Sequence, residues 1–387
     1  MVALKRPKTA VGQFGYISRK QERRGGIETT RTSWAGCFRF WKQERRGGIE
    51  IFPRWTPSSG QRSSTKRERR GSMEDEQPRQ GLNPRTMRKV TVSLIGEQPI
   101  PNLLPLRHQP PDVAVLVHTG RTENVARRLQ RLLQPIEVHL LPTDPYDVQR
   151  IQEDLSNFLA QRAAGAEFEF NLTGGTKTMM VAAYEIARKY NAPFLYLQSE
   201  GKRSILYRYR FDNGEPRYAG KESLSSVITI DDYLKAHLDN YPIDAPKRLK
   251  DDLGKAFEEE IARALEGTVD EVKVGIPLAG ALEVDLVVRK ENQVGVIQAK
   301  TGKKAGSKEG LDQLNAVCEQ RYLGTYTHKI LVVNQQWDQT RSNLRELAQA
   351  WRITVIELPS FNEQHPHLSE EDRQRLRQEV LRVLTGS

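Results

Sequence analysis

The stretch Asn171–Tyr190, NLTGGTKTMMVAAYEIARKY, joins an apolar strand pattern to a helix pattern through a short polar loop. The two glycines of this loop, Gly174 and Gly175, let the backbone approach a ligand closely. The start of the helix offers unpaired N–H groups and a partial positive charge, to which Lys177 adds a full charge. The loop therefore predicts a site for an anionic or acceptor-rich ligand.

The standard phosphate-binding motifs do not fit this loop. A Walker loop requires a glycine directly before its lysine, where this chain has Thr176, and no Gly-x-Gly-x-x-Gly follows the first strand. Two structural alternatives stay open at this point. The glycines can form only a tight strand-to-helix turn, and Lys177 can be a solvated lysine at a helix start.

Residues 87–235 alternate short apolar runs with amphipathic helix patterns, which predicts a parallel, doubly wound α/β sheet. A hairpin turning at 212–214 is expected to follow it. Ligands of such sheets bind at the carboxyl ends of the strands. Three loops fall there: GEQPIPN (Gly96–Asn102), HTGRT (His118–Thr122) and TGGTK (Thr173–Lys177).

Residues 251–387 form a second α/β pattern, and residues 236–250, with Pro242 and Pro246, are the expected linker. The residues of interest here are Asp285, placed late on one strand, and Gln298 with Lys300 on the next. Residues two apart on a strand share a face. Each residue alone is also compatible with a solvated strand end.

The segments VSLIGEQPIPNLL (Val92–Leu104) and NLTGGTKTMMVAA (Asn171–Ala183) resemble the Rossmann-like CARF domain of CRISPR-associated effectors. The resemblance implies a homodimer that binds a cyclic oligoadenylate, usually cyclic tetra-adenylate, across its two-fold axis. A symmetric ring of phosphates suits an isologous interface. By this resemblance the adenine and ribose side is lined by Gly96, Glu97 and Gln98, the phosphates are held by Thr173, Gly174, Gly175, Thr176 and Lys177, and the weaker candidates are His118, Thr119 and Arg121.

The second half resembles the PD-(D/E)xK restriction-endonuclease-like core, in which an Asp precedes a Glu/Gln-x-Lys on a hairpin. The resemblance implies a nuclease that cuts DNA, RNA or both, with Asp285, Gln298 and Lys300 as catalytic residues. Glu258, or alternatively Glu259, would supply the helix carboxylate, and Glu283 a further metal ligand. Phosphodiester hydrolysis needs charge shielding and a hydroxide at neutral pH, which a divalent cation supplies. Oxygen ligands predict Mg²⁺ or Mn²⁺.

Gln298 departs from the Glu that most of that family carries, although Mrr-like restriction enzymes have Gln-x-Lys. The site then carries one negative charge less. Two alternatives to an oligoadenylate-activated endonuclease follow. One is a CARF ligand-binding regulator that is catalytically weak or inactive, and the other is an Mrr-like restriction nuclease that works without oligoadenylate.

The net charge of +11 comes from the N-terminal segment. Residues 1–86 hold 20 Lys+Arg and 8 Asp+Glu, a balance of +12, which leaves −1 for residues 87–387. A nucleic-acid groove in the second segment must therefore be local. The two cysteines exclude a disulfide framework and favour a reducing cytoplasm, and no apolar run is long enough to span a membrane.

The peptide KQERRGGIE occurs at Lys20–Glu28 and again at Lys42–Glu50, and a degenerate copy starts at Lys66. The offsets of 22 and 24 residues equal 66 and 72 nucleotides, the range of a CRISPR repeat plus spacer. We interpret residues 1–86 as a translated array upstream of a true start at Met87, with Met73 as the second choice. The alternative is a basic, disordered arm that binds nucleic acid.

Overall fold

The structure is a computed structural model that describes residues 87–200, 202–242, 252–278, 283–319, 322–337 and 342–386 of the 387-residue chain. The predictions for residues 1–86 and for residues 243–250 of the linker lie outside the described residues. The residues that are described belong to one compact unit.

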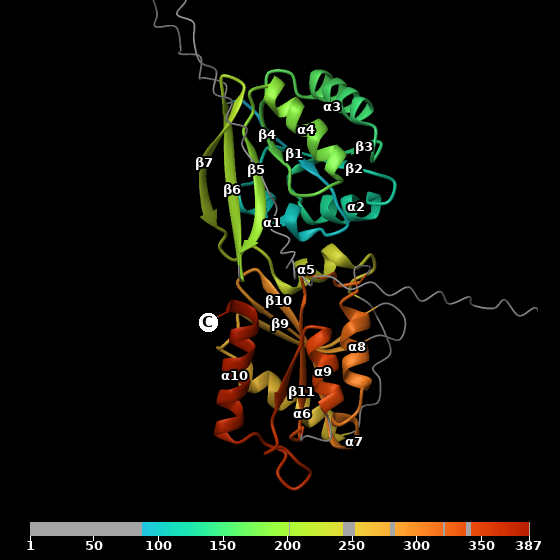
Figure 1. Cartoon of the computed structure of the whole chain (residues 1–387), viewed down its shortest axis with the longest axis vertical. Coiled ribbons are helices and arrows are strands. Elements are labelled where there is room, and N and C mark those ends of the chain that lie inside the picture. Colours follow the sequence, from blue (N-terminus) through green and yellow to red (C-terminus); the bar gives the residue numbers. More distant parts are fainter. Residues whose placement is uncertain are drawn as a thin grey trace, which may run out of the picture. The chain divides into compact units, whose positions relative to one another are not determined.

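The first described half contains a sheet with the strand order β3-β2-β1-β4-β5-β6-β7 (Figure 1). β1 to β5 are parallel, as predicted, and β6 and β7 are antiparallel. The predicted hairpin turns at Asn213 and Gly214, both with positive φ. The elements are β1 (Lys89–Leu94), α1 (Ile100–His108), β2 (Val113–His118), α2 (Glu123–Leu132), β3 (Glu137–Pro142), α3 (Val148–Arg162), β4 (Glu167–Asn171), α4 (Lys177–Lys189), β5 (Phe194–Glu200), β6 (Arg203–Asp212), β7 (Glu215–Ser223) and α5 (Ile230–His237).

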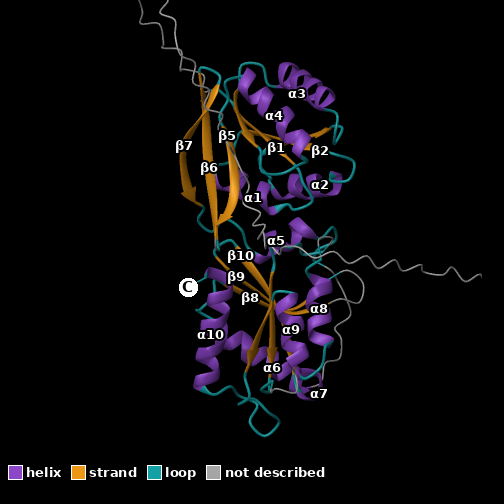
Figure 2. Cartoon of the chain, viewed as in Figure 1, coloured by secondary structure: helices purple, strands orange, loops and turns teal. Residues whose placement is uncertain are grey.

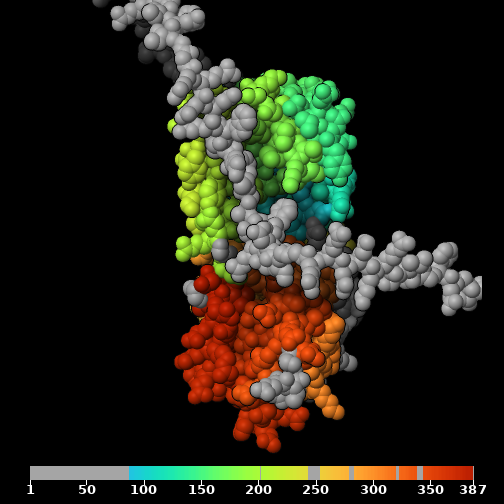
Figure 3. Space-filling model, in the orientation of Figure 1, coloured from blue at the N-terminus to red at the C-terminus, as the bar shows by residue number. Residues whose placement is uncertain are grey.

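Helices cover both faces of the parallel strands. In β2, Val113, Val115 and Val117 pack into the cluster that contains the buried residues of α3 and α4. Ala114 and Leu116 point the other way, into the cluster of α1 and α2. β7 is the edge strand and exposes most of its residues, which lie at the yellow-green surface in Figure 3.

The second described half forms a sheet with the order β12-β11-β10-β9-β8 (Figure 2). β8, β9 and β10 are antiparallel neighbours, whereas β10, β11 and β12 are parallel. The elements are α6 (Asp252–Leu265), β8 (Glu271–Pro277), β9 (Glu283–Lys290), β10 (Gln293–Lys300), α7 (Gly302–Ala305), α8 (Glu309–Val317), β11 (His328–Val333), α9 (Ser342–Ala350), β12 (Ile353–Glu357) and α10 (Glu370–Thr385). α6 and α10 cover one face of this sheet, and α8 and α9 pack with the residues of the other.

Two helices differ from the sequence interpretation. α1 begins at Ile100, so the predicted loop Gly96–Asn102 is shorter than expected. Pro101 in the first turn is compatible with a helix start. Pro105 lies inside the helix, where proline is unfavourable, so the sequence pattern did not indicate a helix here. α10 was also not predicted, because its buried stripe is narrow and the rest of the helix is charged.

The segment that joins the halves contains α5, which packs against α2. Arg128 of α2 donates hydrogen bonds to the Ala236 carbonyl and to Asp239. His237 of α5 is buried, its Nδ1 lies 2.9 Å from the Tyr233 carbonyl oxygen, and its Nε2 has no hydrogen-bond partner. Within the described parts of the chain, no helix combines the length and apolar character needed to cross a bilayer.

We expect the free energy of unfolding to fall as the pH falls from about 6.5 to about 4. Burial lowers the pKa of His237 from 6.5 to about 4, so the unfolded chain binds a proton in this range that the folded chain does not. Stability therefore rises with pH across this window. Replacing His237 with Gln, which keeps a hydrogen-bond donor, should reduce the difference between urea unfolding at pH 7 and at pH 5.

The matched control is His365→Gln, because His365 is exposed. An equal loss of stability on acidification in the wild type and His237→Gln would contradict this prediction.

Candidate functional site

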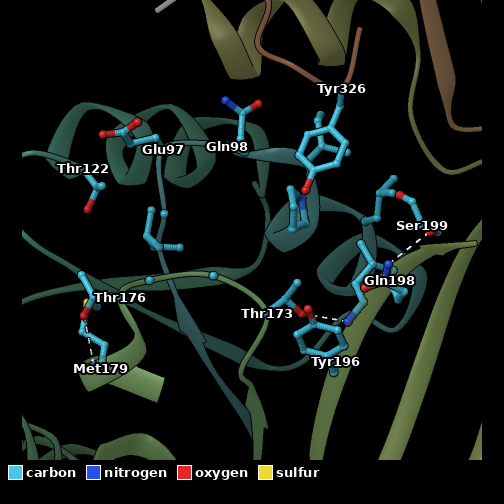
Figure 4. A pocket seen from close by; sticks show the side chains of 18 of the residues that line it. Glu97, Gln98, Thr122, Thr173, Thr176, Met179, Tyr196, Gln198, Ser199 and Tyr326 are labelled. Atoms are coloured by element: carbon cyan, nitrogen blue, oxygen red, sulfur yellow. Dashed lines mark hydrogen bonds between the residues drawn. The ribbon is translucent and has the colours of Figure 1, made fainter. Parts of the chain in front are cut away.

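A cavity of 590 Å³ lies at the carboxyl ends of β1 and β4. These strands are neighbours, and the chain continues to β2 and β3 on one side and to β5 on the other. This is the switch point at which doubly wound sheets bind ligands. The cavity is lined by these predicted residues: Gly96, Glu97, Gln98, Thr119, Thr173, Gly174, Gly175 and Thr176. Figure 4 shows the side chains of Glu97, Gln98, Thr173 and Thr176 around it.

The two glycine loops pack directly on each other. A Cβ built on Gly174 would lie 2.1 Å from the Leu94 carbonyl oxygen, and one on Gly96 would lie 3.3 Å from the Gly175 nitrogen. Gly175 also has a φ of +74°, which favours glycine. Gly174 is thus required by the contact with β1, in addition to any approach of a ligand.

Hydroxyl groups of the second loop are used to hold it in place. Thr173 donates to Asn171 Oδ1 at 2.6 Å and accepts from the Leu197 nitrogen at 2.8 Å, which ties β4 to β5. Thr176 caps α4 by accepting from the Met179 nitrogen at 3.1 Å, and donates to the Pro145 carbonyl at 2.7 Å. The backbone N–H groups at the start of α4 are therefore the main donors that this loop can offer to an anionic ligand.

The charged residues of the pocket differ from the sequence interpretation. Lys177 is exposed at the start of α4 and is absent from the pocket lining, as is the buried His118. Arg121 does line the pocket, and its Nε lies 2.5 Å from Glu97 Oε1. Among the described lining residues, Arg121 is therefore the one with a permanent positive charge.

Sequence reasoning missed several residues of the pocket. Tyr196, Gln198 and Ser199 of β5 line it, and the outward positions of this strand are Tyr196 and Gln198. An exposed aromatic and an amide on one strand face were a usable signal. Four lining residues come from the second half: Asn292, Gln293, Val294 and Tyr326. Their distance in the sequence left no signal for them.

The second candidate site lies on the hairpin of β9 and β10. Asp285 is the third residue of β9 and so lies early on its strand, which corrects the predicted position late on it. The antiparallel pairing, with Leu286 opposite Ile297, brings the start of β9 beside the end of β10. Lys300 Nζ lies 3.3 Å from Asp285 Oδ2 and 2.9 Å from Gln298 Oε1. The predicted Asp, Gln and Lys therefore meet.

Gln298 is almost fully buried, at 1% exposure, and its amide is oriented by a donor and an acceptor. Its Nε2 donates to the Glu283 carbonyl oxygen at 2.9 Å, while its Oε1 accepts from Lys300. A glutamate here would lose the donor and place an oxygen against the Glu283 carbonyl. The amide thus fits the local hydrogen bonding better than a glutamate carboxylate would.

The remaining carboxylates are less closely gathered. Glu258 is buried on α6, Glu259 is exposed beside it, and Glu283 begins β9. Among the described residues, no three His, Cys, Asp or Glu side chains group closely enough to hold a metal ion. The oxygens of Asp285 and Gln298 nevertheless converge on one cation, the Lys300 ammonium. Two hard oxygen donors of this kind fit Mg²⁺, which keeps several of its waters in protein sites.

Two groups near the pocket have shifted pKa values. Burial raises the pKa of the Tyr233 hydroxyl, so this phenol stays protonated and donates to the Leu323 carbonyl. Burial also lowers the pKa of His328 to about 4, and the nearby Lys202 ammonium acts in the same direction. His328 Nε2 lies 3.2 Å from Oε1 of the pocket residue Gln293.

Residues 90–233 match the family model of the Card1 CARF domain, so the first half contains a CARF domain. A comparison with curated protein sequences finds no match. Among solved structures, the chain is similar to Can2 from Sulfobacillus thermosulfidooxidans, solved with cyclic tetra-adenylate, at 16% identity and a TM-score of 0.57, covering 77% of this chain and 99% of that one. It is also similar to protein VC1899 from Vibrio cholerae, at 14% identity and a TM-score of 0.55, covering 76% and 97%.

A third similar structure is a type III CRISPR defence DNA nuclease activated by cyclic oligoadenylate, at 17% identity and a TM-score of 0.50, covering 77% of this chain and 52% of that chain. At these identities the likeness establishes the shared fold. The chain thus combines a CARF domain with a second α/β domain, and it shares this overall fold with the solved structures named here.

We expect Gly174→Ala to lower the free energy of unfolding by about 1–3 kcal/mol, because the new methyl group overlaps the Leu94 carbonyl oxygen. The matched control is Gly120→Ala, where an added Cβ meets nothing within 4 Å and the expected change is within about 0.5 kcal/mol. Urea unfolding measures both. Equal stability of the two variants would contradict this prediction, because it would show that the loop of Gly174 can move away from Leu94 at little cost.

Proposed function

We propose that the chain is an endonuclease of type III CRISPR defence that is activated by cyclic oligoadenylate and depends on Mg²⁺ or Mn²⁺. The observation that carries the proposal is a CARF domain with a cavity of 590 Å³ at its switch point, joined to a hairpin on which Asp285, Gln298 and Lys300 meet. The chain would act as a homodimer, with the ligand on its two-fold axis.

The ligand of this proposal is cyclic tetra-adenylate, because a structure similar to this chain was solved with it. Backbone N–H groups of Gly174 to Lys177 would bind phosphate oxygens, with Arg121 as the nearest full positive charge in the lining. The loop of Gly96, Glu97 and Gln98 would face the sugar and base.

The cleavage chemistry would belong to the hairpin residues. A divalent cation, held by Asp285 and Gln298, would supply a hydroxide at neutral pH and shield the phosphate charge. Lys300 is only 11% exposed and already lies against both oxygens. When the phosphodiester is bound, its ammonium would hold the attacking water or stabilise the charge that develops on the phosphate oxygens.

A local basic segment follows this site and suits a nucleic-acid substrate. Lys303 and Lys304 are exposed on α7, directly after Lys300, and Lys308 is exposed at the start of α8. Lys304 and Lys308 also pair with Glu309 and Asp312. The near-neutral charge of residues 87–387 requires phosphate binding to be concentrated in such a place.

A second candidate function is a ligand-binding regulator with a catalytically weak second domain. It is favoured by the absence, among the described residues, of a group of three His, Cys, Asp or Glu side chains that could hold a metal. The neutral Gln298 further lowers the negative charge of the site. The two candidates differ in whether nucleic acid is cut when ligand and metal are both present.

We expect Asp285→Asn to lower ligand-stimulated cleavage by at least about 100-fold, because the carboxylate that pairs with Lys300 and would hold the cation is lost. Cleavage of single-stranded and supercoiled substrates with Mn²⁺, with and without cyclic tetra-adenylate, measures this, and binding of the cyclic tetra-adenylate should not change. Asp270→Asn is the control, because Asp270 pairs with Arg289 and Lys290 away from the site.

Three results would reject the nuclease assignment or change it. Equal cleavage by Asp285→Asn and the wild type would reject the catalytic site. Cleavage without any oligoadenylate would favour the Mrr-like alternative, and ligand binding without cleavage would favour the regulator.

We expect Gln298→Glu to raise the affinity for Mn²⁺, because it adds a carboxylate beside Asp285, and to lower the free energy of unfolding by about 1–3 kcal/mol, because the Glu283 carbonyl loses its donor. Calorimetric Mn²⁺ titration and urea unfolding measure the two effects, with the exposed Gln349→Glu on α9 as the control. Unchanged affinity and unchanged stability would contradict the role given to the amide.

A further inference from the structure

The second half of the chain supplies part of the wall of the CARF pocket. Asn292, Gln293 and Val294 line it at the turn and first residues of β10, and Tyr326 lines it just before β11. No part of the CARF match, which ends at residue 233, includes these residues. The pocket is therefore built by both halves.

Tyr326 is the aromatic residue among these four. Its side chain is 52% exposed, and in Figure 4 its ring extends into the cavity from the side opposite Tyr196 of β5. Tyr196 is itself an exposed aromatic residue. Flat aromatic faces that stay in contact with water are suited to stacking with nucleobases, since every base presents a π-face.

The turn that carries Tyr326 is held firmly in place. The Tyr233 hydroxyl donates to the Leu323 carbonyl at 3.1 Å and lies 2.7 Å from Thr327 Oγ1, which donates to the same carbonyl at 2.6 Å. Tyr233 belongs to α5 and lines the pocket as well. The ring of Tyr326 therefore projects from a turn that is anchored on both sides.

The same turn also contacts the predicted ligand loop. A Cβ built on Gly324 would lie 2.2 Å from Gln98 Oε1, so the Gln98 side chain packs directly on the turn. The amide nitrogen and oxygen of Gln98 are both buried and have no hydrogen-bond partner. A ligand that moves the Gly96–Gln98 loop would consequently press on the turn of Tyr326.

We propose that Tyr326 stacks on a base of the bound cyclic oligoadenylate, so that the second domain binds the activator directly. This inference rests on the proposed function, since it needs an oligoadenylate in the CARF pocket. Stacking in the pocket requires no charge from Tyr326, only its ring. Tyr326 is then a binding residue for the activator that lies outside the CARF domain.

The position of the contact gives it a consequence for activity. β10 begins at the pocket with Gln293 and ends with Lys300, a distance of about 23 Å at about 3.3 Å per residue. β11, which follows Tyr326, pairs with β10 along this length up to Val333 beside Lys300. A ligand that binds one arrangement of these strands more tightly than another would therefore also change the positions of Gln298 and Lys300 at the far end of β10.

The test compares Tyr326→Ala, Tyr326→Phe and the control Tyr218→Ala in the full chain. Tyr218 is similarly exposed, at 58%, but lies on β7 outside the pocket lining. Calorimetry with cyclic tetra-adenylate should show a roughly 5- to 100-fold loss of affinity for Tyr326→Ala. Tyr326→Phe, which keeps the ring, and Tyr218→Ala should bind as the wild type does. Thermal unfolding of each variant checks that it is folded.

A second measurement uses a cyclic tetranucleotide in which 2-aminopurine replaces one adenine. Its fluorescence should be quenched by the wild type and Tyr326→Phe, and less by Tyr326→Ala, because stacking on the ring quenches it. Wild-type affinity of Tyr326→Ala, or an equal loss in Tyr326→Phe, would overturn the stacking role while leaving the proposed function intact. If the wild type bound no cyclic oligoadenylate, the proposed function itself would be overturned, and this inference with it.

Discussion

The close approach of Gly174 to the carbonyl oxygen of Leu94 is the contact on which the pocket depends. It brings the loop after β4 onto the end of β1, and these two strands are the neighbours between which the chain order reverses. Asn171 and Thr173 then tie the same loop to β5 and to the start of α1. The start of α4 therefore lies at the cavity, where its backbone N–H groups can bind an anion.

The sequence was informative where local chemistry has few solutions. Two glycines between a strand and a helix specify a turn almost independently of context, whereas the capping role of Thr176 became known only from the structure. The β9–β10 hairpin was similar, because residues two apart on a strand share a face. The sequence was less informative for α1, because Pro105 is unfavourable inside a helix. The burial of the apolar residues of α1 in the core offsets this cost, and that burial cannot be seen in the local sequence.

Contacts between distant segments were beyond local reasoning. Tyr326 enters the pocket only because β10 and β11 pair in parallel, which places the turn before β11 beside the start of β10. Lys177 shows the opposite case. Its type and position suggested a phosphate ligand, but the Lys177 side chain is exposed and absent from the lining, while Arg121 from another loop contributes the positive charge there. The presence of a charged side chain can be read from the sequence, but whether that side chain reaches a given pocket cannot.

The hydrogen bonds around Asn292 bear on how the two halves could communicate. Asn292 lines the pocket, donates to the Ser225 carbonyl at 2.7 Å and accepts from the Val227 nitrogen at 3.1 Å. The segment after β7 is thus bonded to the turn that precedes β10. A rotation of the two halves relative to each other has to break these bonds. A shift of β10 and β11 driven by a ligand against Tyr326 and Gln293 can keep these bonds, provided that the segment after β7 moves together with the turn. β10, which carries Lys300 at its end, would then be the shorter path between the two sites.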